Sequence, residues 1–222
     1  QYGNQLSIAA FNGPSSVVVS GSGSALNDVK LAFEAQGIRC VALSTSHAFH
    51  SASMEPMLES LDAVAASIQH HSPTLPIASN LTGTLADQAT FQNSRYWSQH
   101  ARQAVQFEKN FEAICDQGCN VFIEIGPQPI LIGMANRIPT QQRLHWIPSI
   151  RKELDDEQSM LQAIAKLWTI GCDIDCSNRG SEDHAKIIPL PTYPFERRRY
   201  FGGVTLLDRL RLGSQRKDSP SH

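Results

Sequence analysis

Residues 43–51 of the chain read LSTSHAFHS, and His50 stands one residue before the end of this stretch. The apolar residues 40–43 predict a short buried strand, and residues 58–68 carry an apolar stripe that predicts a helix. His50 is therefore expected in a strand-to-helix connection, where a rigid scaffold holds side chains at a cleft. An imidazole can take a proton from a nucleophile and return it to a leaving group. A lone loop histidine is more often a surface or packing residue, so the surrounding sequence has to decide.

The composition describes an ordinary globular protein, with 222 residues, 41% apolar residues and a formal net charge of −2. This length suits one large domain or two small ones. The near-neutral charge favours neither nucleic acid nor a membrane as partner, and no apolar run is long enough to cross a bilayer. The chain begins without Met and shows no signal peptide, so we expect a cytoplasmic segment of a longer protein.

Metal binding is considered because cysteines and histidines occur in pairs. The pairs Cys115/Cys119 and Cys172/Cys176 share a C-x-x-x-C spacing, but structural zinc sites usually use C-x-x-C, and each pair straddles a predicted helix end. The adjacent histidines at 70–71 do not face each other on a helix. Five cysteines, an odd number, argue against a closed disulfide framework. We expect no metal, and reduced thiols in a cytosolic protein.

Strand and helix signals alternate along most of the chain. Residues 1–45 show a β-turn-β-α-β pattern like part of a small ferredoxin-like subdomain. Their glycine-rich turn, residues 21–24, lacks the full phosphate-binding pattern, so Ser24 is expected to cap a helix that Gly37 ends. Further strands are predicted at 75–79, 121–125 and 144–149, with helices between them and a last helix that Gly171 closes. This alternation predicts an α/β fold with a mostly parallel sheet.

The sequence after residue 176 is polar and rich in proline. Aromatic residues interleave with an arginine-rich stretch, a composition also seen in proteins that bind single-stranded nucleic acid. Because residues 189–191 (PLP) favour extended chain, a linker that packs on a neighbouring domain is the preferred interpretation, and no nucleic-acid partner is expected.

Five stretches match one family in the same order: residues 12–21 (NGPSSVVVSG), 47–51 (HAFHS), 96–107 (YWSQHARQAVQF), 122–127 (FIEIGP) and 190–195 (LPTYPF). Together they resemble the acyltransferase domain of modular type I polyketide synthases, which is related to the malonyl-CoA:acyl carrier protein transacylases. Any single match would be weak, but five in order across roughly residues 8–201 are specific.

The resemblance implies an α/β-hydrolase-like large subdomain with an inserted ferredoxin-like small subdomain. Residues 1–45 would be part of the small subdomain, residues 46–176 the C-terminal part of the large one, and residues 177–222 the linker and tail after the domain. Partners would be an acyl carrier protein and the adjacent ketosynthase and other synthase domains.

In this family a serine in a G-H-S-x-G elbow attacks malonyl-CoA, and the acyl group then passes to the phosphopantetheine thiol of the carrier protein. The resemblance assigns the catalytic base to His50 and needs no bound cofactor. It assigns the selection of malonyl over methylmalonyl to His47 and Phe49. Supporting roles would fall to Asn12, near the acyl-enzyme, and to His100, whose backbone carbonyl would orient the base.

The chain departs from the family because it contains no G-x-S-x-G, and Gly21-Ser22-Gly23 has the wrong spacing. The nucleophile and the arginine that holds the malonyl carboxylate would lie upstream. We expect an acyltransferase in the parent protein and an inactive fragment alone. The alternatives are a non-catalytic docking module that contacts carrier protein or neighbouring domains, and an unrelated hydrolase that uses an internal serine with His50.

Overall fold

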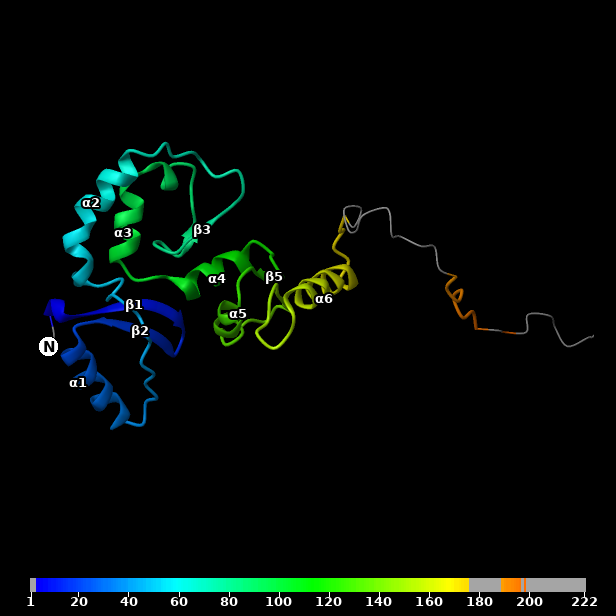
Figure 1. Ribbon diagram of the computed structural model, residues 1–222, viewed down its shortest axis with the longest axis horizontal. Coiled ribbons are helices and arrows are strands. Elements are labelled where there is room, and N and C mark those ends of the chain that lie inside the picture. The colour runs from blue at the N-terminus through cyan, green and yellow to red at the C-terminus, as the bar shows by residue number, and fades with distance from the viewer. Residues whose placement is uncertain (1–2, 176–188, 197, 199–222) are drawn as a thin grey trace, which may run out of the picture. The chain divides into compact units, whose positions relative to one another are not determined.

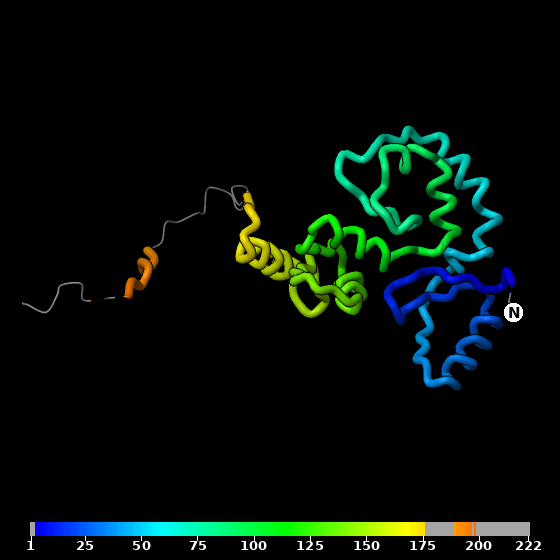
Figure 2. Tube along the Cα trace, turned by 180° about the vertical axis from the view of Figure 1, so that it is seen from behind, coloured from blue at the N-terminus to red at the C-terminus, as the bar shows by residue number. Residues whose placement is uncertain are grey.

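The computed structural model describes residues 3–175, 189–196 and 198 of the chain. The chain divides into two compact units, Gln1–Ile174 and Asp175–His222. All the named helices and strands of Figure 1 belong to the first unit, and Figure 2 shows the same trace from behind. In the second unit the rings of Tyr193 and Phe195 meet edge to face, with centroids 4.9 Å apart.

The first elements are a β-hairpin and a helix. Strands β1 (Leu6–Gly13) and β2 (Ser16–Gly21) pair antiparallel, and α1 (Gly23–Glu34) follows. The residue that precedes α1 is Ser22 rather than the predicted Ser24, and its side chain makes no capping bond. Gly37 stops the helix as predicted, because its φ of +77° is a conformation that glycine adopts without strain.

Residues 40–43 do not form the strand that their composition predicts, and this prediction is wrong for the described structure. Residues 38–45 have no regular secondary structure, and Val41 and Leu43 are 65% and 61% exposed. A strand exists only where its backbone N–H and C=O groups meet those of a neighbour, and no described strand pairs with this segment.

Helices α2 (Glu55–Ala66) and α3 (Arg95–Arg102) pack against each other, and lie side by side in both views. Between them the chain forms a short hairpin of β3 (Ala78–Ser79) and β4 (Thr84–Leu85). The predicted strand at 75–79 is thus cut to two residues. The buried Ser79 hydroxyl lies 3.0 Å from the phenol oxygen of Tyr96, which joins the hairpin to α3.

A further group of helices and strands completes the first unit. Its elements are α4 (Phe107–Asp116), β5 (Val121–Glu124), α5 (Ile130–Ala135), β6 (His145–Pro148) and α6 (Asp156–Thr169). Strands β5 and β6 pair in parallel. The packed core between them and the helices contains Phe111, Cys115, Ala135 and Ile138, with Phe107, Phe122, Leu144 and Trp146 against it.

Glu124, the glutamate of the FIEIGP stretch, connects β5 to α5 through hydrogen bonds. Glu124 ends β5, and its two carboxylate oxygens accept the backbone N–H groups of Leu131 (2.9 Å) and Ile132 (2.8 Å). These N–H groups belong to the first turn of α5 and have no partner inside the helix. The motif therefore joins the strand to the helix that follows it.

The predicted sheet, mostly parallel, is not what the described residues form. They contain three two-stranded sheets, of which β5–β6 alone is parallel. The other two pairs are hairpins, because short turns join their strands and only antiparallel strands can be connected in this way. A single parallel bridge between Ala10 and Val105 links β1 to the segment after α3.

Candidate active site

The loop that carries His50 is held by hydrogen bonds within itself and to α3. Ser51 is 1% exposed; its hydroxyl donates to the Ala48 carbonyl (2.6 Å) and accepts from the Ser53 N–H (3.2 Å). The His50 N–H donates to the carbonyl of Ala101 over 3.1 Å. That carbonyl lies in the last turn of α3, where helical carbonyls lack partners within the helix. The loop is irregular in shape but fixed in position.

His50 has an unusual backbone conformation. Its φ is +58°, the only positive φ at a non-glycine residue within the described ranges. L-residues rarely adopt this left-handed region, and such strain persists where the surrounding contacts enforce it. Here the bonds on either side of His50 supply that enforcement.

The imidazole of His50 is oriented by a backbone carbonyl. Its Nδ1 lies 2.8 Å from the carbonyl oxygen of Gln103. A carbonyl oxygen only accepts, so Nδ1 carries the proton and Nε2 of the neutral ring keeps its lone pair. The half-buried ring is therefore in the tautomer that a general base requires.

The orienting carbonyl belongs to Gln103 and not to His100, the residue predicted for it. Helix α3 ends at Arg102, and Gln103 turns into extended backbone with ψ of 160°. The segment is then anchored to β1, because Val105 donates to the Ala9 carbonyl and its own carbonyl accepts from Phe11, each over 2.9 Å. A carbonyl beyond the helix end is free to face the loop, whereas His100 is still inside the helix.

An ion pair adds a second tie between the loop and α3. The Arg102 Nε donates to a carboxylate oxygen of Glu55 over 3.0 Å, and both side chains are partly exposed. Glu55 is the first residue of α2, directly after the turn that follows His50. Exposed pairs of this kind contribute little stability, typically below about 1 kcal/mol.

The side chain of His100 lies beside His50, although its carbonyl does not. The His50 and His100 rings meet edge to face with centroids 5.8 Å apart, and the Tyr96 ring stacks on that of His100 at 5.9 Å. The Nε2 atom of His100 is buried and has no hydrogen-bond partner. Burial, and then the nearby His50, lower the pKa of His100.

The residues predicted to select the substrate, His47 and Phe49, stand close to His50 in the chain. Phe49 is 49% exposed, and its ring meets that of the exposed His47 edge to face at 5.9 Å. The Nδ1 atom of His47 also lies 2.9 Å from the hydroxyl of Ser46. Both side chains are exposed, and their role in selection stays a prediction.

Asn12 lies in β1, next to the residue that bonds the segment after α3. The pairing of β1 with β2 is irregular between Phe11 and Gly13, so Asn12 sits at a bulge. Its side chain is half-buried, and within residues 3–175 no hydrogen bond joins it to His50. The predicted role of Asn12 near the acyl-enzyme stays a prediction.

No hydroxyl or thiol within the described ranges hydrogen-bonds to the ring of His50. The ring of His50 has one hydrogen-bond partner there, the carbonyl of Gln103. The nearest serine in the sequence, Ser51, uses its hydroxyl within the loop. What the described residues assemble is an oriented base whose Nε2 has no protein partner.

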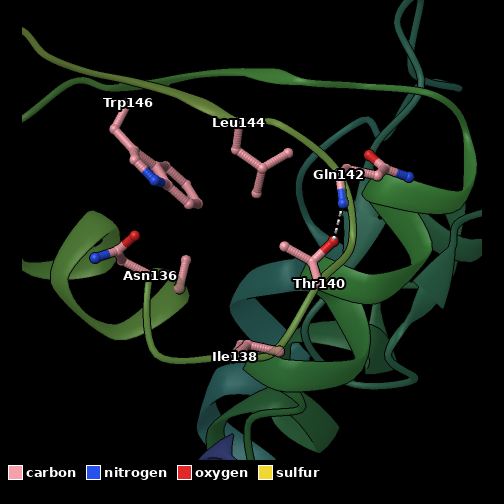
Figure 3. Close-up of a pocket in the computed structure, with 7 residues that line it drawn as sticks. Asn136, Ile138, Thr140, Gln142, Leu144 and Trp146 are labelled. Carbon is pink, nitrogen blue, oxygen red and sulfur yellow. Dashed lines mark hydrogen bonds between the residues drawn. The ribbon is translucent and has the colours of Figure 1, made fainter.

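A hollow on the surface lies elsewhere, beside α5 and β6. Ile138, Leu144 and Trp146 form its apolar wall, and the Thr140 hydroxyl accepts from the Gln142 N–H (3.2 Å), as Figure 3 shows. None of the residues predicted for the site lines this hollow. Four of its lining residues, Ala135, Ile138, Leu144 and Trp146, also belong to the packed core or pack against it.

The other sites considered from sequence gain no support. No group of three or more His, Cys, Asp or Glu side chains within the described ranges could hold a metal ion. Cys115 is buried, which raises its pKa, whereas Cys119 is exposed. Cys176 and most of the arginine-rich stretch lie outside the described residues. None of the helices in the described part is long and apolar enough to span a bilayer.

The sequence of this chain is similar to those of known acyl transferase domains and polyketide synthases. The family model for the acyl transferase domain matches residues 2–174. The chain is 34% identical over 204 residues to the PKS-NRPS hybrid synthetase acdB of Aspergillus candidus, covering 91% of this chain and 8% of that protein. It is 36% identical over 197 residues to mycoketide-CoA synthase of Mycobacterium tuberculosis, covering 89% and 5%.

Solved structures share the fold. The acyltransferase domain from the second module of the salinomycin polyketide synthase superposes with a TM-score of 0.79 at 34% identity, over 87% of this chain and 45% of that one. Malonyl CoA-acyl carrier protein transacylase from Clostridium perfringens has a TM-score of 0.66 at 23% identity, which speaks for the fold alone. The chain thus spans 45% and 50% of these two solved chains, and 8% and 5% of the two curated relatives.

Proposed function

Because this chain belongs to the acyl transferase domain family of polyketide synthases, we propose that it supplies the general base of a malonyl transferase. The observation that carries the proposal is the bond from His50 Nδ1 to the Gln103 carbonyl, which leaves Nε2 free to accept a proton. His50 is also the last histidine of the HAFH motif, one of the motifs on which the resemblance rests.

The proposed reaction has two half-steps. A serine hydroxyl attacks the thioester carbonyl of malonyl-CoA while His50 Nε2 takes the serine proton. The C–S bond then breaks, and the imidazolium returns the proton to the departing CoA sulfur. In the second half-step the phosphopantetheine thiol of an acyl carrier protein attacks the acyl-serine, with the same proton movements. The chain needs no cofactor of its own in this scheme.

The serine is proposed to come from a segment of the parent protein outside these residues. No G-x-S-x-G elbow occurs in the 222 residues, and the chain covers only 45% of the solved acyltransferase domain. The chain alone is therefore proposed to be inactive. We also propose that residues 1–45 and 46–176 are parts of the two subdomains, and that residues 177–222 are the linker and tail. The adjacent ketosynthase and a cytoplasmic location also remain proposals.

Malonyl selectivity is proposed to depend on Phe49, supported by His47. Phe49 is half exposed beside the base, so its ring can limit the space for a methyl branch on the extender unit. Exclusion of one methyl group by shape is worth about 1–3 kcal/mol, roughly a 10- to 200-fold preference. Replacement of Phe49 by serine should relax the preference without removing transfer.

The absence of a described hydroxyl at Nε2 supports a second candidate, a non-catalytic docking module that contacts carrier protein or neighbouring domains. The coding sequence of the parent protein separates the two candidates. A G-H-S-x-G elbow upstream of residue 1 supports the transferase, and its absence supports the docking module.

The decisive experiment loads a longer form of the protein, which includes the elbow, with radiolabelled malonyl-CoA or methylmalonyl-CoA. We expect malonyl label on the protein, and His50→Ala should slow loading by about 10²- to 10⁴-fold, the usual contribution of a general base. His71→Ala, which removes an exposed histidine elsewhere, is the matched control. The 222-residue chain should take no label. Unchanged loading in His50→Ala would refute the role of the base.

A further inference from the structure

Three rings from α3 and the neighbouring loop form a continuous row. Tyr96 is fixed by the contact of its phenol with Ser79, and its ring lies nearly parallel to that of His100, with an interplanar angle of 10°. His100 in turn presents its ring to His50 at an interplanar angle of 70°. The row therefore runs from the buried Ser79 of the β3–β4 hairpin to His50, and His100 is the ring in contact with both Tyr96 and His50.

The protonation of His100 is constrained by its surroundings. An imidazolium carries a proton on both nitrogens, and at His100 one of these would sit on the buried Nε2, where no acceptor is present. The neutral ring with its proton on Nδ1 leaves only a lone pair at the buried position. His50, the facing titratable group, repels a second positive charge. The charged residues of the helix ends that pack here, Glu55 and Arg102, pair with each other.

We propose that His100 is a positioning residue for His50: a ring kept uncharged that forms the wall against which the base is held. The wall keeps the His50 ring turned with Nδ1 toward Gln103 and Nε2 toward the open side. Because the wall carries no charge, it does not oppose the positive charge that His50 gains when it accepts the serine proton. This inference rests on the proposed function of His50, and it assigns His100 a role through its ring instead of its carbonyl.

The first test follows the histidines of the unchanged chain by NMR as the pH is lowered. His100 should remain neutral to a lower pH than the exposed His71, and ¹⁵N shifts should place the neutral His50 proton on Nδ1. If His100 takes up a proton at the same pH as His71, or if His50 populates both tautomers equally, the proposal is overturned. These measurements need neither serine nor substrate, so they stand even if the transferase proposal fails.

The second test changes the ring in the longer, loadable form of the protein. His100→Ala removes the wall, and we expect serine acylation to slow about 10- to 100-fold with KM for malonyl-CoA unchanged, because a misplaced base loses its near-attack geometry. His100→Phe restores a flat uncharged ring and should return the rate, and the pH of its acid limb, to near those of the unchanged protein. His70→Ala is the control, since the His70 ring stacks on Trp97 of α3 at 6.5 Å, whereas the described ring contact of His50 is with His100.

The two variants at position 100 distinguish a role of the ring from a role of its nitrogen atoms. If both variants at position 100 lose activity equally, a nitrogen of His100 is required and the neutral-wall proposal is wrong. If neither changes the rate, the ring has no positioning role. Should His100→Ala fail to fold by circular dichroism, the His100→Phe profile and the titration of the unchanged chain still decide the question.

Discussion

Two neighbouring segments of the chain behave in opposite ways. Residues 38–45 are rich in apolar side chains, yet they form no strand, and Val41 and Leu43 face solvent. Residues 46–54 are more polar and contain one 3-10 turn as their only regular structure, Ala52–Met54, yet hydrogen bonds hold His50, and Ser51 is buried. Order in this part of the molecule follows from the supply of backbone partners and not from hydrophobicity. The first segment lacks a partner among the described strands, whereas the second has the open end of α3.

The largest expected contrast is in amide hydrogen exchange. The N–H of His50 donates to Ala101, whereas no described acceptor meets the N–H groups of Val41 and Leu43. We expect the His50 amide to exchange about 100-fold more slowly than either of them after correction for intrinsic rates, because exposed unbonded amides open at almost no cost. Equal protection, measured by NMR, would show that the two segments are equally ordered.

A matched pair of serine variants tests the loop bonds. Ser51→Ala removes a buried hydroxyl with two partners, and should lower the free energy of unfolding by about 1–2 kcal/mol, as for other caps and buried hydrogen bonds. Ser44→Ala removes an exposed hydroxyl in the other segment and should change nothing measurable. Urea unfolding of the two variants gives the difference, and similar values for both would contradict a locked loop.

The ion pair between Arg102 and Glu55 should contribute less. A double-mutant cycle with Arg102→Ala and Glu55→Ala is expected to give a coupling of about 0.2–1 kcal/mol, because both side chains are partly exposed. The coupling should shrink in high salt. A coupling above about 2 kcal/mol would mean that the pair, and not the backbone bonds, fixes the loop.

The smallest effect on stability is expected from substitutions in residues 38–45, which pair with no described strand. Replacement of Val41 and Leu43 by serine should change the stability of this chain by less than about 0.5 kcal/mol, because both side chains are already exposed. The same changes in a longer form of the protein should cost more if a further strand pairs there. Equal costs in the two forms would mean that the segment never becomes a strand.

Predictions that depend on interactions between residues close in the sequence were more accurate than those that depend on distant residues. Helices α1 and α6 were predictable because their periodicity and the glycines that stop them, Gly37 and Gly171, are local signals, and both glycines have positive φ. The strand at 40–43 and the mostly parallel sheet were wrong because pairing depends on distant segments. The β3–β4 hairpin was missed, although Gly83, with φ of +73°, marks its turn.

At the candidate site, too, local signals could be read from the sequence and contacts between distant residues could not. The HAFH motif located His50, and the resemblance indicated that a backbone carbonyl would orient it. The motif could not place that carbonyl at Gln103, because this depends on where α3 ends, and helix ends are set by capping contacts that sequence patterns locate poorly. Nor could it show that the side chain of His100 faces the base.

The bond between His50 and Gln103 joins residues that are 53 positions apart in the chain. For an otherwise unstructured loop of that length, closure costs about 3.5 kcal/mol of chain entropy, more than one hydrogen bond returns. The docking of α2 on α3 and the hairpin between them shorten this loop, so the bond of His50 depends on contacts made elsewhere. We therefore expect a change that loosens the helix pair to release the His50 ring before the helices themselves unfold.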